Sequence, residues 1–235
     1  MPTNDAAIDA IALLDEPARR ALYDLVTSRT EAVGRDEAAE AVGIGRALAA
    51  FHLDRMVRDG LLVAEYKRRS GRTGPGAGRP AKLYRRAPGT IAVSLPQRDY
   101  EVAAQLLASA IERSSPDIPP PAASDAARDA GLEIGERARQ QAGPRARHAR
   151  RKAALINELR DHGYEPREEK PGEILLGNCP FDALVDQHRP LVCGMNLALA
   201  EGILDGLGDD RLHAVLDQQP GRCCVTLHDE DPAVR

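Results

Sequence analysis

The chain has 235 residues, of which 43% are hydrophobic and 29% charged, with a formal net charge of −4. These values are ordinary for a globular protein and exclude a disordered or fibrous chain. The length predicts one or two domains, each able to form a core without disulfide or metal staples. No apolar run approaches the roughly 18 residues that cross a bilayer, and no signal-peptide pattern stands at the N-terminus. We therefore expect a cytoplasmic protein that does not engage membranes.

The charge is unevenly distributed along the chain. Between Arg46 and Arg86 there are 11 Lys or Arg residues against 3 Asp or Glu, a net charge of +8, which leaves −12 for the rest of the chain. Lys67–Arg86 carries eight basic residues and no acid. Like charges at this density repel one another, so an anionic partner is the favoured interpretation, and a solvated loop is the alternative.

Residues 15–60 have the pattern of three consecutive helices. Asp15-Glu16-Pro17 is typical of a helix start, because acids favour the positive end of the helix dipole and proline fits the first turn. A second helix is expected over Asp36–Val42, ended by Gly43. A third is expected from Arg46 to Asp59, with Leu48/Ala49, Leu53 and Met56/Val57 facing inward.

Two strands are expected after these helices, at Leu61–Tyr66 and Ala81–Tyr84, joined by a glycine-rich basic loop. Helix, glycine turn, helix, strand, basic loop, strand is the order of a winged helix-turn-helix, whose second helix normally reads the major groove of DNA. A helical pair used for protein contacts is the alternative. His52 is interpreted equally well as a core residue or a DNA contact. The predicted DNA contacts are Arg46, Ala47, Ala50, Phe51, Arg55, Arg69, Arg72, Arg79 and Lys82.

Three segments of this region resemble the ArsR-type winged-helix regulators in the broad sense. They are Leu13–Arg20, Leu48–Arg55 and Gly60–Leu62, within a match over roughly residues 8–90. Metal-sensing members carry cysteines on the helix-turn-helix, whereas the first cysteine here is Cys179. The resemblance thus implies a DNA-binding domain but argues against a heavy-metal sensor of that kind.

The middle of the chain is expected to be helical and to mediate pairing. An apolar stripe of Tyr100, Ala103, Leu106/Leu107 and Ala110/Ile111 marks a helix over Arg98–Arg113. The proline-rich segment Ser114–Ser124 is expected to be a stiff hinge, followed by helices over 126–141 and 145–162. Because winged-helix repressors usually bind two half-sites as symmetric dimers, we expect the first helix to pack on a second copy. Packing within its own domain is the alternative.

The last seventy residues have the pattern of a small α+β domain. Strands are expected at 164–169, 173–176, 212–216 and 222–228, and a helix over Gly194–Leu207. The predicted fold class is therefore α+β. We expect three parts: a winged helix-turn-helix domain at 1–90, a helical dimerisation and linker region at 91–142, and a cysteine-containing α+β sensor domain at 143–235.

All four cysteines lie in this last part, at 179, 193, 223 and 224. Clustered cysteines in a chain without an export signal favour metal or redox ligands over disulfides. Their spacing is not the paired C-x2-C of zinc ribbons. Cys193 is expected to open a helix, where the dipole favours thiolate. Strand alternation is expected to point Cys223 inward and Cys224 away, which leaves His188 or Cys224 as an uncertain fourth ligand.

Together with the winged helix, three cysteine segments resemble those of the SufR-type iron–sulfur cluster repressors. The segments are Asn178–Pro180, Leu191–Cys193 and Arg222–Cys224. The resemblance implies that Cys179, Cys193 and Cys223 hold an iron–sulfur cluster of the [4Fe–4S] type. Zinc, or buried structural thiols without any metal, are the alternatives.

The combined expectation is a homodimeric transcriptional repressor that binds an inverted-repeat operator in double-stranded DNA under the control of a cluster. A winged-helix regulator that senses zinc, a small organic ligand or thiol oxidation is the alternative. An enzyme is disfavoured, because Cys193 and His188 lack an orienting third group and no dinucleotide-binding glycine motif follows a strand.

Overall fold

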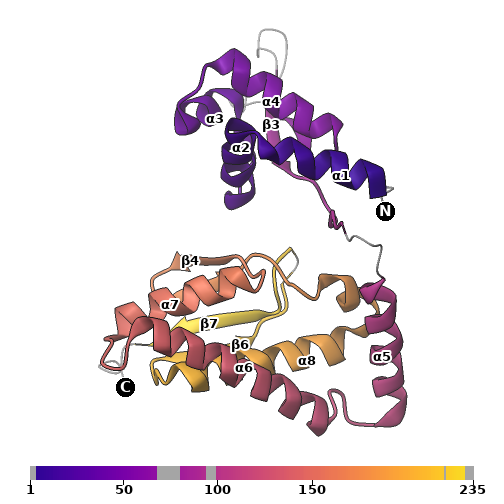
Figure 1. The fold of residues 1–235 in the computed structure, drawn as a ribbon, viewed down its shortest axis with the longest axis vertical. Helices are drawn as coiled ribbons and strands as arrows, with labels where there is room; N and C mark the ends of the chain where they lie inside the picture. The colour runs from indigo at the N-terminus through magenta and orange to yellow at the C-terminus, as the bar shows by residue number, and fades with distance from the viewer. Residues whose placement is uncertain (1–3, 68–79, 94–98, 220, 231–235) are drawn as a thin grey trace. The chain divides into compact units, whose positions relative to one another are not determined.

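The computed structural model describes residues 4–67, 80–93, 99–219 and 221–230, and the chain divides into two compact units, 1–98 and 99–235 (Figure 1). Both units combine helices with antiparallel strands, so the expected α+β class is confirmed. The three-part division is not observed. The two helices expected in a separate region at 91–142 belong to the second unit, where both contact its longest helix.

Unit 1 contains helices around a three-stranded sheet with the order β1-β3-β2. The expected second and third helices and both strands are confirmed. The helix over residues 4–12 and the short strand β1 were not predicted. The elements are α1 (Asn4–Ala12), a 3-10 turn (Leu13–Asp15), α2 (Pro17–Ser28), β1 (Val33–Gly34), α3 (Arg35–Val42), α4 (Arg46–Arg58), β2 (Leu62–Lys67) and β3 (Ala81–Arg86).

Local chemistry explains where the helices of unit 1 begin and end. The Glu16 carboxylate accepts hydrogen bonds from the backbone N–H of Ala18 and of Arg19, at 3.1 and 2.8 Å, and so caps α2. Gly43 ends α3 with a φ of 73°, a left-handed conformation that favours glycine. The helices and the sheet then share one aliphatic core, in which the largest fully buried side chains are Leu22, Leu53, Met56, Leu62 and Tyr84.

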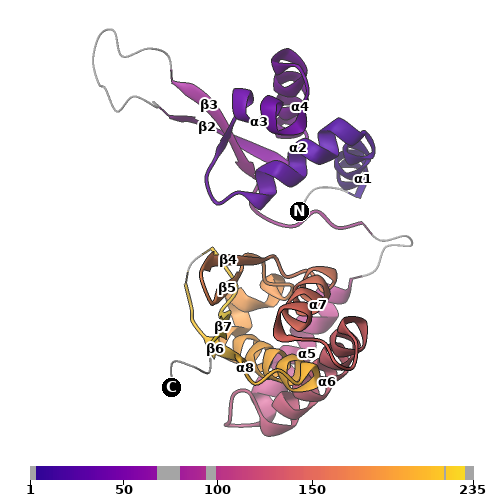
Figure 2. The same ribbon diagram turned by 90° about the vertical axis from the view of Figure 1, so that its left-hand side faces the viewer.

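Unit 2 packs four helices with a four-stranded antiparallel sheet of order β4-β5-β7-β6 (Figure 2). The expected strands are confirmed, but the last helix begins at Asp182 instead of Gly194. The expected hinge is also shorter, because α6 already begins at Pro121. The elements are α5 (Tyr100–Ser114), α6 (Pro121–Ala142), α7 (His148–Asp161), β4 (Pro166–Lys170), β5 (Glu173–Leu176), α8 (Asp182–Leu207), β6 (Leu212–Leu216) and β7 (Val225–Asp229).

Four glycines bring α6 and α8 into close contact. A Cβ on Gly135 would lie 2.0 Å from the backbone oxygen of Ile203, and one on Gly202 would lie 2.1 Å from that of Arg128. Gly131 and Gly206 are equally tight against the opposite backbone. Each helix thus carries two glycines four residues apart, which lets the two backbones approach within a distance that any side chain would prevent.

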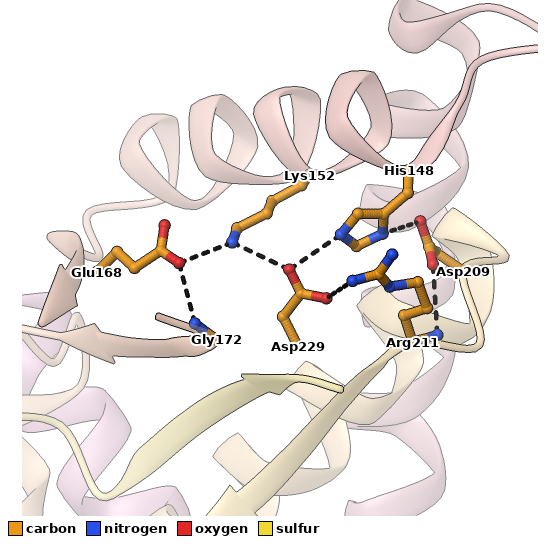
Figure 3. Close-up of polar contacts among 7 residues, drawn as sticks. All are labelled: His148, Lys152, Glu168, Gly172, Asp209, Arg211 and Asp229. Atoms are coloured by element: carbon orange, nitrogen blue, oxygen red, sulfur yellow. Dashed lines mark hydrogen bonds and ion pairs between the residues drawn. The ribbon is translucent and has the colours of Figure 1, made fainter. Parts of the chain in front are cut away.

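A network of charged side chains joins α7 to the sheet (Figure 3). The two ring nitrogens of His148 each lie 2.9 Å from a carboxylate oxygen, one of Asp209 and one of Asp229. The Asp229 carboxylate also accepts from Lys152 at 3.0 Å and pairs with Arg211 at 3.2 Å. Burial raises the pKa of Asp229, but hydrogen bonds from His148 and Lys152 outweigh it, so the net pKa is lowered. This carboxylate is therefore charged and tied to α7 at neutral pH.

By length and composition, α8 is the one helix among the described residues that could cross a membrane, and 61% of its most apolar window is buried inside unit 2. It packs against α5, α6 and the sheet. The apolar composition of α8 is therefore explained by its packing in the core of unit 2.

Candidate functional site

The exposed face of α4 carries most of the side chains predicted to contact DNA. Arg46, Ala47, Phe51 and Arg55 are exposed there, with Phe51 at 55%. Ala50 is half-buried. Leu48 was predicted to face inward but is 46% exposed, so the apolar stripe of this helix is narrower than expected. Arg69, Arg72 and Arg79 lie outside the described residues.

Each of the basic predicted contacts in the described part of unit 1 has an acidic partner nearby. Arg46 forms a short hydrogen bond and ion pair with Asp36 on α3, and both side chains are 68% exposed. Arg55 Nε lies 3.3 Å from Asp59, and Lys82 Nζ lies 2.7 Å from Asp54. Because exposed pairs of this kind contribute little to stability, the arginines can exchange their carboxylate for another anion at low cost.

Asp54 is the centre of a network that joins α3, α4 and β3. Its carboxylate accepts hydrogen bonds from Arg35, Lys82 and Tyr84, at 2.7, 2.7 and 2.6 Å. Burial raises the pKa of Asp54, but these three donors together lower it further than burial raises it. Burial and the bond to Asp54 raise the pKa of Tyr84 to about 12. The network therefore fixes α4 relative to β3, and Arg35 was missed in the sequence because it precedes the helical pattern.

A surface cavity of about 410 Å³ lies beside this network. Its lining includes three basic side chains, those of Arg35, Arg46 and Lys82, together with Asp36 and Tyr66. The concave surface at the start of α4 is thus mainly basic, as an anion-binding surface requires.

His52 belongs to the core of unit 1. It is 6% exposed, and its Nε2 lies 3.7 Å from the Glu16 carboxylate that caps α2. Its Nδ1 is buried without a hydrogen-bond partner among the described residues. A side chain buried in this position cannot contact DNA. Of the two interpretations of His52, a core residue or a DNA contact, the structure therefore supports the core residue.

Unit 2 brings all four cysteine thiols together. Cys179 and Cys224 each lie close enough to Cys223 to shift its pKa, and Cys193 lies similarly close to Cys224. Cys193, Cys223 and Cys224 are 2%, 1% and 7% exposed, whereas Cys179 is half-buried, and all four are free thiols. Cys223 is central, and the thiol hydrogen bonds it receives from Cys179 and Cys224 lower its pKa.

Two expectations about these cysteines are wrong. Cys224 was predicted to point away from Cys223 by strand alternation, but β7 begins only at Val225, so the alternation does not apply to either residue. Cys193 was predicted to open a helix, but it lies inside α8. A kink at His188 divides α8, and Cys193 follows it by five residues, next to the proline-containing turn at Pro190.

Two polar residues that were not predicted complete the surroundings of the thiols. The Nδ2 of Asn196 on α8 donates to Cys223 Sγ at 3.1 Å and lies 3.9 Å from Cys224 Sγ. Its Oδ1 accepts a 2.5 Å hydrogen bond from the Tyr164 hydroxyl. Burial, followed by the neighbouring thiols, raises the pKa of Tyr164, so its hydroxyl remains a donor. The one feature of the sequence that could have identified Asn196 is that it is an amide side chain within an otherwise apolar helix.

His188, a candidate fourth ligand, faces a different partner. Its Nδ1 lies 2.8 Å from the Glu112 carboxylate on α5. Its Nε2 is buried and has no hydrogen-bond partner in the part of the chain that the structure describes. Of the two candidates for a fourth ligand, Cys224 is therefore the one that contacts the other thiols.

The thiol group has the donor chemistry of an iron–sulfur site, since thiolates are the usual ligands of such clusters. In the described ranges, no three or more His, Cys, Asp or Glu side chains are arranged to hold a metal ion. The four thiols are therefore not arranged as the ligands of a cluster in this structure. A cluster would require the thiols to rearrange, and Cys179, Cys223 and Cys224 lie outside regular helices and strands.

Comparisons with known proteins identify no relative of this chain. No protein-family model matches it, and neither a curated protein nor a solved structure is significantly similar to it. The arguments for its function therefore come from the residues and their geometry.

Proposed function

We propose that the chain is a DNA-binding transcriptional repressor whose first unit is a winged helix-turn-helix. The observation that carries the proposal is the exposed face of α4, with arginines at both ends, beside the antiparallel β2–β3 pair. Such a helix fits the major groove when its outer face begins with small or cationic side chains, as Arg46 and Ala47 provide. The ArsR-like segments of the sequence support the same assignment.

The residues of α4 would divide the work of recognition. The exposed Arg46 and Arg55 would donate to base edges, and the exposed Phe51 would offer an apolar surface to a thymine methyl group. Lys82 and the basic residues between β2 and β3 would contact phosphates, which give affinity without sequence preference. A homodimer would place two such helices on an inverted repeat.

We further propose that the thiols of unit 2 hold an iron–sulfur cluster of the [4Fe–4S] type. Cys179, Cys193 and Cys223 are the ligands that the resemblance to SufR-type repressors implies, and the contacts of Cys224 add it as a fourth candidate. Bound, the cluster would supply a redox- and iron-dependent signal. Loss of the cluster would let the cysteine-bearing loops close, and the two states could then differ in operator affinity.

The contacts between the thiols favour a second candidate, oxidation without a metal. Cys179 and Cys223 share a hydrogen bond, so an oxidant such as hydrogen peroxide could join them as a disulfide. Zinc or a small organic ligand are further alternatives, for which the described residues offer no specific observation. Iron and sulfide analysis of protein purified without oxygen, together with its visible spectrum, separates the cluster from the other candidates.

Selection of binding sites from random duplex DNA tests the DNA-binding function. An inverted repeat with half-sites about one helical turn, or a multiple of it, apart is expected. Arg46→Ala or Arg55→Ala should cost about 1–3 kcal/mol on the selected site alone. Arg72→Ala or Arg79→Ala should weaken binding to every sequence and reduce the salt slope by about 1. Recovery of no sequence, or of one asymmetric half-site bound by a monomer, would contradict the proposal.

A further inference from the structure

Helix α5 presents a continuous apolar stripe that nothing in the described part of the chain covers. Tyr100 is 73% exposed, Leu106 67% and Leu107 66%, and Val102 beside them is 48% exposed. Ala103 and Ala110 are exposed on the same side. Monomeric soluble proteins rarely expose a contiguous group of large apolar side chains, so such a group on one helix face indicates an interaction surface.

The opposite side of α5 is already in use within unit 2. Ala108 is 5% exposed, and Glu112 pairs with His188 at the kink of α8. Figure 1 shows α5 at one end of the unit, where it packs against α8. The exposed stripe is therefore held in a fixed direction, since the helix cannot rotate without breaking these contacts.

The stripe is nearly symmetric about its midpoint between Leu106 and Leu107. Ala103 and Ala110 lie at equal distances from that midpoint in the sequence, as do Tyr100 and Arg113. An antiparallel second copy of the helix would therefore place alanine opposite alanine, where the backbones can approach, and leucine beside leucine. It would also place the Tyr100 ring against Arg113, an arrangement that favours a cation–π contact.

Charge also favours an antiparallel partner. Asp99 is the N-cap of α5 and Arg113 lies in its last turn, while Glu112 beside Arg113 is paired with His188. In an antiparallel pair, the acidic start of one copy meets the basic end of the other at both ends of the interface. A parallel pair would instead place like charges together at each end. An interface in which each copy uses the same surface, so that residue i contacts residue j and j contacts i, is isologous and has two-fold symmetry.

We propose that α5 pairs antiparallel with α5 of a second copy of this chain, centred between Leu106 and Leu107. The assignment rests on the homodimer of the proposed function but requires neither DNA nor a cluster. On the other side of α5, Glu112 pairs with His188 at the kink of α8, five residues before Cys193, so the paired helix contacts α8 close in sequence to its thiol.

Site-specific photocrosslinking of the full chain tests the pairing. Tyr100 is replaced by p-benzoylphenylalanine, an aromatic side chain of related shape, and the irradiated protein is digested for mass spectrometry. We expect a species of twice the chain mass in which residue 100 is joined to the segment 110–114 of the other copy. A crosslink between the two residue-100 segments, or one to residues 4–93 in a species of single-chain mass, would overturn the proposal.

Sedimentation equilibrium of the reduced full chain supplies an independent measurement. Leu106→Glu with Leu107→Glu should raise the dimer dissociation constant at least tenfold, with the far-ultraviolet circular dichroism unchanged. Leu132→Glu is the matched control, because Leu132 is 41% exposed on α6 and lies outside the stripe. A wild-type chain that is monomeric at all concentrations overturns the pairing even if it binds DNA. A crosslinked dimer that binds no DNA overturns the proposed function and leaves the pairing intact.

Discussion

Asn196 Nδ2 lies 3.1 Å from Cys223 Sγ, while Asn196 Oδ1 accepts a hydrogen bond from Tyr164. One buried amide on α8 thus connects the thiol group to Tyr164, two residues before β4. Since the amide and the hydroxyl are both removed from water, each needs the other to be satisfied. Any rearrangement of the thiols must either keep this amide in place or leave a buried polar group without a partner.

The first prediction is that Asn196→Ala destabilises unit 2 by about 1–3 kcal/mol, because it leaves the buried Tyr164 hydroxyl without its acceptor. Urea unfolding of the metal-free, reduced protein measures this loss. Asn178→Ala is the control: its amide donates to the Gly163 carbonyl at an exposed position, so its effect should be smaller. Equal losses in the two variants would show that the buried amide has no special role.

The second prediction concerns the close contact of α6 and α8. Gly135→Ala places a Cβ 2.0 Å from the Ile203 carbonyl oxygen, so the helices must separate. Overpacking of this kind costs typically about 1–3 kcal/mol, and calorimetry should show a lower melting temperature. Gly45→Ala, where a Cβ meets nothing within 4 Å, should leave the melting temperature nearly unchanged. An unaltered Gly135→Ala protein would contradict the packing of these helices.

The third prediction is a loss of stability in acid that depends on Asp229. Its pKa is lowered in the folded chain from an ordinary value of 3.8, so its contribution is present above that value and is lost as the pH falls below it. The free energy of unfolding is measured at a series of pH values from about 6 down to about 3. It should decline less steeply with falling pH for Asp229→Asn than for the wild type. Asp186→Asn, at an exposed position of α8, should follow the wild-type curve.

The fourth prediction is that Asp36→Asn increases DNA affinity. The substitution removes the carboxylate that pairs with Arg46 and takes one negative charge from the edge of the basic cavity. Tighter binding to both specific and random duplexes is expected in fluorescence anisotropy at fixed salt. Asp5→Asn, at an exposed position of α1, is the control for net charge alone. If Asp36→Asn and Asp5→Asn bind DNA with the same affinity as each other, the pairing of Asp36 with Arg46 has no role in DNA binding.

Regular periodicity in the sequence was sufficient to predict much of the fold. The apolar pattern around Leu53 and Met56 and the strand-like run Leu61–Tyr66 predicted α4 and β2 within one or two residues. The last helix was expected to begin at Gly194, yet α8 begins at Asp182 and continues through Pro190, with a kink at His188. The exposure of Leu48 shows the limit of a periodicity argument on a helix that is partly solvated.

The thiol site was predictable in its members but not in its geometry. The sequence singled out Cys179, Cys193 and Cys223, and the structure places Cys179 near Cys223 and Cys193 near Cys224. The position of Cys224 could not be derived, because its orientation depends on where β7 begins. Asn196 and Tyr164 meet only through tertiary packing, and no spacing in the sequence signals that contact.

The central claim is that the thiol group controls DNA binding, and one measurement tests it most directly. The affinity of the full chain for its selected inverted repeat is measured without oxygen, before and after iron–sulfur reconstitution, for the wild type and for Cys223→Ser. We expect a brown wild-type protein whose affinity changes by about 1–3 kcal/mol on reconstitution, and a colourless variant whose affinity does not change. A wild-type protein that stays colourless and iron-free, or binds the repeat equally in both forms, would contradict the account.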